Sequence, residues 1–213
     1  MLTDTKFLNN VFDVRTYPYE IIKRSRNSKL GRKVNKGRWR GMPIYTVTLP
    51  ERRTCPSYCE QWEVCYGNHM PFAHRIDPLP DPELFIQRIE EEVAVLSYKH
   101  RRTGFVIRLH VLGEFFSVEY VEAWYRLFTK YDNLKIYGYT HHVVLSDIGG
   151  AIWSMRDEDF NIRFSDSPYF DNSANSTKTF NSITCPEQTG HVKSCGDCAL
   201  CWTAKKPIHW ITH

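Results

Sequence analysis

A regular alternation of short apolar segments with longer amphipathic ones constrains the fold of this chain more than any other feature of its sequence. Segment 81–100 carries apolar residues at helical spacing behind a capping Asp81, and Ser117 and Ser146 are placed to cap two further helices. Six segments rich in β-branched and aromatic residues predict strands: 43–49, 105–112, 134–140, 161–165, 180–184 and 207–212. Strands joined by such helices pair in parallel, so we expect an α/β fold, either an open parallel sheet or a partial barrel.

The length of the chain and its apolar content set the number of domains. A chain of 213 residues builds one sizeable core, so we expect residues 1–213 to form a single domain. No run of 18 apolar residues occurs, which predicts no membrane span. The first ten residues lack the basic and apolar regions of a secretion signal. We therefore expect a cytoplasmic protein whose thiols stay reduced and bind a metal or take part in catalysis.

Seven cysteines fall into two groups, and an odd number excludes a full set of disulfides. The C-terminal group, within residues 185–201, consists of Cys185, Cys195, Cys198 and Cys201. Its C-x2-C-x2-C triplet matches the bacterial ferredoxin run, in which a Cys-Pro step such as Cys185-Pro186 supplies the fourth ligand. We expect this segment to hold a [4Fe–4S] cluster, with zinc as the alternative.

The N-terminal group has only three thiols, Cys55, Cys59 and Cys65, in the spacing C-x3-C-x5-C. Three cysteines on a cubane cluster leave one iron open to a substrate or cofactor. Alternatively, His69 or His74 completes a closed zinc or cluster site. The chain therefore has one cluster or two.

Polar residues follow the predicted strands at corresponding positions. Gly113 and Glu114 follow the second strand, His141 and His142 the third, and Ser165 and Asp166 the fourth, as Cys55 follows the first. The carboxyl ends of parallel strands share one edge of a sheet, and that edge carries the site in such folds. We expect one pocket there, with Glu114, His141 and Asp166 as candidate catalytic residues.

This layout resembles that of the radical S-adenosylmethionine (SAM) enzymes. That superfamily has a partial (β/α)6 barrel, a three-cysteine loop after the first strand and a glycine–glutamate motif after the second. The resemblance implies an open cluster on the first cysteine group and SAM bound by its amino group at Gly113 and Glu114, with Ser165 or Asp166 at the ribose. The usual spacing is C-x3-C-x2-C, from which this chain departs by three residues.

Several ordered segments also resemble the phage "gene product eighty-eight" family. They include "TCPSYCEQWEVCYG", "RLHVLGEFFSVEYVEAW", "YGYTHH", "RFSDS" and "SCGDCALCW". This resemblance implies a phage origin, hence the host cytoplasm, and an iron–sulfur cysteine set, with no settled reaction.

A basic segment, residues 21–50, holds nine Lys and Arg and no acid, whereas the rest of the chain is net negative. Such asymmetry indicates contact with a polyanion, and we expect weak, salt-sensitive binding of nucleic acid there.

Three functions stay open on the sequence alone. The first is a radical SAM-like enzyme. The second is an iron–sulfur protein without SAM chemistry, acting in electron transfer, sensing or nucleic-acid processing, with an electron donor as partner if the cluster is redox-active. The third is a zinc-stapled nucleic-acid-binding module.

Overall fold

A computed structural model of the chain describes residues 4–167 and 173–211. Within these residues, one sheet of eight strands organises the molecule in the order β2-β3-β5-β6-β7-β8-β10-β9. The strands are β2 (Lys23–Arg24), β3 (Ile44–Thr46), β5 (Phe105–Leu109), β6 (Leu134–Thr140), β7 (Phe160–Ser165), β8 (Ser173–Asn175), β10 (Ile208–His209) and β9 (Ile183–Thr184). All neighbours are parallel except β2 and β3.

The prediction of a mostly parallel α/β sheet is confirmed, and each of the six predicted segments contains a strand. Thr212, at the end of the last predicted segment, lies outside the described residues. The strands β3, β5, β6 and β7 lie side by side in chain order, the order of a barrel wall, but the described strands do not close into a barrel. The three-residue strand β8 was not predicted, because a segment so short carries no readable period.

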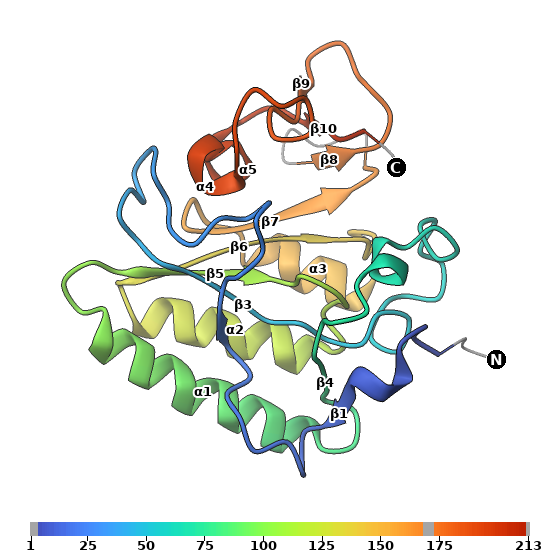
Figure 1. Ribbon diagram of the computed structural model, residues 1–213, viewed down its shortest axis with the longest axis vertical. Coiled ribbons are helices and arrows are strands. Elements are labelled where there is room, and N and C mark those ends of the chain that lie inside the picture. The colour runs from blue at the N-terminus through green and yellow to red at the C-terminus, as the bar shows by residue number, and fades with distance from the viewer. Residues whose placement is uncertain (1–3, 168–172, 212–213) are drawn as a thin grey trace.

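Three helices cover one face of the sheet, with α1 and α2 beneath it in Figure 1. They are α1 (Pro82–Lys99), α2 (Val118–Lys130) and α3 (Asp147–Ser154), in agreement with the predicted segments. The predicted caps are present: Asp81, Ser117 and Ser146 each accept a hydrogen bond from a backbone amide of the first turn. Apolar residues of the three helices and of alternate strand positions form the larger core.

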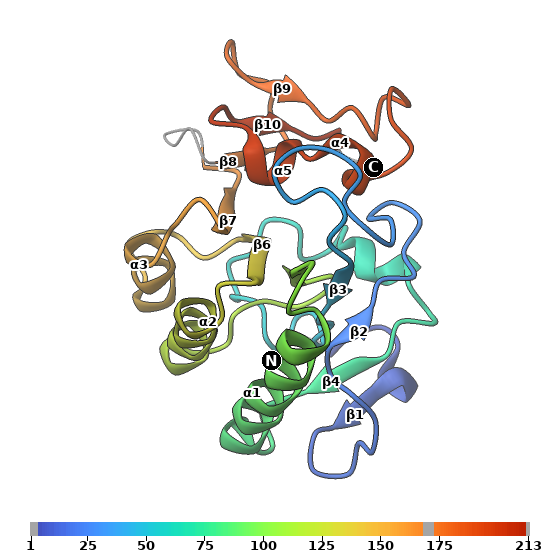
Figure 2. The same cartoon turned by 90° about the vertical axis from the view of Figure 1, so that its left-hand side faces the viewer.

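The other face of the sheet is covered by two segments that are far apart in the sequence. The loop 25–43 and the short helices α4 (Cys195–Cys198) and α5 (Leu200–Thr203) lie against each other over this face (Figure 2). Trp39 and Trp202 stack there with ring centroids 5.3 Å apart, and Tyr137 of β6 packs against Trp202 at 4.6 Å. A second, smaller core therefore separates the sheet from solvent on this side.

A separate parallel pair, β1 (Val11–Asp13) and β4 (Arg75–Asp77), lies beside α1, and two 3-10 helices, η1 (Leu8–Asn10) and η2 (Tyr66–His69), complete the elements. No helix in the described part of the chain is long and apolar enough to cross a membrane.

Candidate functional site at the carboxyl edge of the sheet

The loops after β5, β6 and β7 bring Glu114, His141 and Asp166 together. The backbone amide of His141 donates to Glu114 Oε1 at 2.9 Å, and His141 Nδ1 lies 3.7 Å from the same oxygen. On the other side of the imidazole, Nε2 lies 3.9 Å from Asp166 Oδ2. The histidine thus stands between two carboxylates at the edge where the parallel strands end.

Each of these three side chains has one buried polar atom without a hydrogen-bond partner among the described residues. The atoms are Glu114 Oε2, His141 Nε2 and Asp166 Oδ2. Asp166 uses its other oxygen to accept from the amide and hydroxyl of Ser176, at 2.6 and 2.7 Å. A buried acceptor left unpaired costs free energy, so unpaired atoms gathered at one place are suited to a polar ligand that donates to them.

Gly113 allows the Glu114 loop to lie against the loop that follows β3. Its φ is +75°, and an added Cβ would come within 2.5 Å of the Leu49 Cβ and 2.6 Å of Thr54 Oγ1. In return, the amide of Glu114 donates to Thr54 Oγ1 at 3.1 Å. The glutamate is therefore fixed beside Cys55, the residue that follows Thr54.

The charge state of Glu114 follows from its neighbours. Burial by itself would raise the pKa of Glu114, but hydrogen bonding to His141 and the charges of His141 and His142 offset this and hold it below its ordinary value. His142 itself is buried, with Nε2 2.8 Å from the Phe115 carbonyl oxygen, and so joins the loop after β6 to the loop after β5. Glu114 is therefore a carboxylate at neutral pH.

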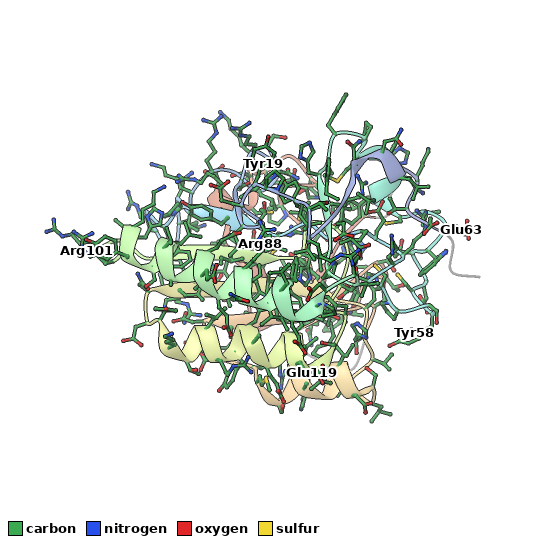
Figure 3. The ribbon with its side chains drawn as sticks, turned by 90° about the horizontal axis from the view of Figure 1, so that it is seen from below. Tyr19, Tyr58, Glu63, Arg88, Arg101 and Glu119 are labelled. Atoms are coloured by element: carbon green, nitrogen blue, oxygen red, sulfur yellow. The ribbon has the colours of Figure 1, made fainter. Side chains whose placement is uncertain are left out.

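The first cysteine group lies in the loop that leaves β3, next to Glu114. All three thiols are half-buried. Burial and the charge of Glu114 raise the pKa of Cys55, and burial raises the pKa of Cys59 to about 11. Figure 3 shows Tyr58 and Glu63 of this loop at one end of the molecule, with Arg101 at the opposite end.

A buried ion pair holds the first cysteine loop, and the sequence analysis missed it. Arg75 Nε donates to Glu51 Oε2 at 2.7 Å and Nη2 to Oε1 at 3.0 Å, with both side chains at most 1% exposed. The same guanidinium donates to the carbonyls of Gly67, Met70 and Ala73. No spacing or motif signals this pair, because its members lie 24 residues apart in unrelated segments.

The second cysteine group lies over the sheet, beneath the loop 25–43. Cys195 and Cys201 are both buried, and the Tyr139 hydroxyl donates to Cys201 Sγ at 2.7 Å. The nearby Cys195 thiol and the hydrogen bond from Tyr139 lower the pKa of Cys201. Cys185 and Cys198 are half-buried nearby.

The residue Arg108 connects the surroundings of the two groups. Its guanidinium lies over the Tyr139 ring, 5.1 Å from the centroid, and is close to both Tyr66 and Cys195. Tyr66 follows Cys65 in the chain and donates to the Val111 carbonyl. Arg108 therefore lies near a residue from each of the two cysteine segments.

The donor chemistry of both groups suits a soft metal centre. In residues 4–167 and 173–211, no three His, Cys, Asp or Glu side chains gather closely enough to hold a single metal ion. The sulfur-only donor sets are those that iron–sulfur clusters use, and the thiols within each group lie close enough to shift one another's pKa. A single ion would require either group to draw closer together.

The remaining predicted site residues are placed as follows. Ser165 is the last residue of β7, half-buried and paired through its backbone with Ala174 of β8. His69 and His74, the candidate fourth ligands, are exposed and line a groove that is separate from the carboxyl-edge site. The His74 ring packs on Phe12, with centroids 5.0 Å apart.

A family model described as Gene product 88 matches residues 21–165, more than half of the chain. The match includes the first cysteine group, Gly113, Glu114, His141 and Ser165, and it ends before Asp166 and the second cysteine group. No curated protein and no solved structure matches the chain.

Proposed function

The chain belongs to the Gene product 88 family, and from that premise and the site geometry we propose that it is an iron–sulfur protein with a SAM-binding site at the carboxyl edge of its sheet. The first cysteine group binds the cluster, and Glu114 receives the amino group of SAM. Residues Asp166 and Ser165 are the candidates for contact with the ribose.

One observation carries this proposal. The buried atoms Glu114 Oε2, His141 Nε2 and Asp166 Oδ2 have no hydrogen-bond partner in the described part of the chain, and they lie beside a thiol-bearing loop. A ligand with an ammonium group and neutral hydroxyls would satisfy carboxylate oxygens of this kind. The lowered pKa of Glu114 keeps its charge available for such an ammonium group at neutral pH.

The three cysteines act together with these residues. When bound there, a [4Fe–4S] cluster supplies an iron with an open coordination position and one electron. Gly113 keeps the Glu114 loop close to Cys55 because it has no side chain, and His141 holds Glu114 Oε1 in place through its amide. The chain's own residues thus orient the ligand, whereas a separate electron donor must reduce the cluster.

The second cysteine group has a separate role in this proposal. It binds a fully ligated [4Fe–4S] cluster that staples the C-terminal segment onto the sheet. Cys195 and Cys201 are both buried, with Cys201 hydrogen-bonded to Tyr139, which suits a closed site more than an open one.

The test is anaerobic purification followed by iron, sulfide and zinc analysis and electron paramagnetic resonance of the reduced protein with and without SAM. We expect a brown protein with iron and labile sulfide whose spectrum changes when SAM is added. Cys65→Ser should abolish the change, and Glu114→Gln should weaken it. Glu119→Gln is the matched control, because Glu119 is an exposed carboxylate in the first turn of α2 (Figure 3).

Each outcome separates the candidate functions. A colourless protein with stoichiometric zinc would overturn the iron–sulfur assignment in favour of a zinc-stapled module. An iron–sulfur spectrum that stays the same in excess SAM would leave an iron–sulfur protein without SAM chemistry. If SAM changed the spectra of Glu114→Gln and Glu119→Gln to the same extent, Glu114 would not be a SAM-binding residue.

A further inference from the structure

A large hollow lies away from the cysteines and their carboxylates. It is a groove of about 1280 Å³ along the edge strand β2, between α1 and the loop 69–74. Its walls include the cations Lys23, Arg24, Arg26 and Lys99 and the aromatic rings of Tyr19 and Phe72. In Figure 3, Tyr19 lies above α1 near Arg88, whose Nη2 donates to the Tyr19 carbonyl at 2.6 Å.

A second hollow, of about 470 Å³, adjoins this groove and shares Arg24 and Arg26 with it. The other two residues of its wall are Ser25 and Arg32. Ser25 is 1% exposed, and its hydroxyl has no hydrogen-bond partner among the described residues. Three arginines and a serine with a buried, unpaired hydroxyl therefore line this second hollow.

These arginines differ from others of the basic segment in having no acidic partner. In the part of the chain that the structure describes, Arg24, Arg26 and Arg32 form no ion pair, whereas Arg38 pairs with Glu158 at 2.8 Å and with Asp159 at 2.9 Å. Lys29 lies 3.5 Å from Glu187. Among the cations of the segment 21–50 that have no ion pair within the described residues, Arg24, Arg26 and Arg32 line the second hollow.

The groove also contains exposed aromatic rings. Phe72 is 93% exposed and Tyr19 is 63% exposed, so both rings are accessible to a ligand. Of the three carboxylates in the wall, Glu92 is turned to the backbone, accepting from the amides of Ile21 and Ile22 at 2.8 and 2.7 Å. Only Glu20 and Glu91 remain to oppose a bound anion.

We propose that the two hollows together bind single-stranded nucleic acid. Backbone phosphates lie against Arg24, Arg26 and Arg32 and accept from the Ser25 hydroxyl. Unpaired bases stack on Phe72 and Tyr19, as bases do on the exposed rings of single-strand-binding proteins. A duplex keeps its base faces stacked inside and offers nothing to these rings, so a single strand is the favoured partner.

This assignment does not depend on a cluster. The test is fluorescence anisotropy with labelled oligonucleotides of about 15 nucleotides, as DNA and as RNA, over a series of salt concentrations. The variant R24Q/R26Q/R32Q should bind at least about tenfold more weakly, and its slope of log affinity against log salt should be shallower by about two. Phe72→Ala should weaken binding with the slope unchanged.

The matched control removes the same charge from the same segment outside both hollows. K33Q/K36Q/R40Q alters three exposed cations that line neither hollow, and it should retain most of the affinity and the slope. Melting temperatures of both triple variants verify folding. The proposal would be overturned if both triple variants lost affinity equally, or if the unaltered protein did not bind the oligonucleotides. It would also be overturned if the protein bound a duplex as tightly as a single strand, or if polyglutamate competed as well as an unlabelled oligonucleotide.

Discussion

At the scale of single residues, Arg75 organises the first cysteine loop. Its guanidinium holds the Glu51 carboxylate and three carbonyl oxygens in a site that water does not reach. A charge pair buried in this way contributes little net stability, but loss of one partner leaves the other charge uncompensated. The position of Cys55, Cys59 and Cys65 therefore depends on a pair that is not itself part of the site.

The substitution Glu51→Gln should lower the free energy of unfolding by about 3–5 kcal/mol, because Arg75 keeps its charge in the protein interior. Urea denaturation measures this loss. Replacement of both partners, E51L/R75M, should recover part of it. Glu90→Gln, in the exposed pair with Arg126, is the control and should change stability little. Equal effects of Glu51→Gln and Glu90→Gln would contradict the prediction.

Gly113 offers a second test at this scale, because Gly41 has a similar backbone conformation in open space. Both have positive φ, +75° and +94°, but an added Cβ meets nothing within 4 Å at Gly41. Gly41→Ala should cost only the left-handed conformation, about 1–2 kcal/mol. Gly113→Ala should cost more, because Leu49 and Thr54 must move. Urea denaturation that gave equal losses would show that the close approach at Gly113 carries no strain.

At the scale of elements, Arg163 of β7 attaches the C-terminal segment to the sheet. It is fully buried, and its guanidinium donates to the carbonyls of Cys201 at 2.8 Å and Ala204 at 2.6 Å. Weaker bonds reach the carbonyls of Ser173, Leu200 and Lys206. One planar side chain thus satisfies the backbone of a segment that has little regular structure of its own.

Arg163→Lys should loosen this segment, because an ammonium group has three donors at one point and cannot span carbonyls on several sides. Limited proteolysis should then cut within residues 176–194 sooner than in the unaltered protein, with the helix-covered half still resistant. Arg101→Lys, at an exposed position just beyond the end of α1, is the control (Figure 3). An unchanged digestion pattern for Arg163→Lys would show that other contacts hold the segment.

Elements with local signals could be predicted from the sequence. The helices begin at Asp81, Ser117 and Ser146 because each cap acts within one turn. The meeting of Glu114 with His141 also follows, because parallel strands end at one edge. Their roles as catalytic or SAM-binding residues stay predictions.

The packing of the loop 25–43 and of α4 and α5 on the second face of the sheet could not be predicted in the same way. It depends on contacts such as that between the Cys195 amide and the Lys29 carbonyl, 2.7 Å apart, which no local pattern encodes. The ion pair of Glu51 with Arg75 and the groove beside β2 depend likewise on which segments the fold brings together. Much of the basic segment is likewise packed against the C-terminal segment, which its composition does not indicate.

At the scale of the whole molecule, buried His110 makes stability depend on pH. Burial lowers its pKa from 6.5 to about 3, while its Nε2 stays hydrogen-bonded to the Tyr120 hydroxyl at 3.0 Å. Between these two values the unfolded chain binds a proton that the folded chain does not. His110 therefore lowers the free energy of unfolding as the pH falls from 6.5 toward 3, and above pH 6.5 it has no such effect.

The slope from this single group is at most about 1.4 kcal/mol per pH unit. Urea denaturation of the unaltered protein and of His110→Gln at several pH values between 4 and 7 measures it. The difference between the two proteins should narrow as the pH falls, because only the histidine must gain a proton on unfolding. Parallel profiles would show that His110 does not titrate in this way.

The packing of the loop 25–43 against α4 and α5 over the sheet also determines when the protein can finish folding. Asn35 Nδ2 donates to Asp197 Oδ1 at 2.7 Å across 162 residues of sequence, and the smaller core closes only when both segments are present. During synthesis, the helix-covered half can form before the ribosome has made the C-terminal segment against which the basic segment packs. Contacts of such long range slow folding, since a large loop must close before any of them forms. In the interval, Val106 and Tyr137 lie uncovered on the nascent sheet, at the stage when such a chain is most prone to aggregate.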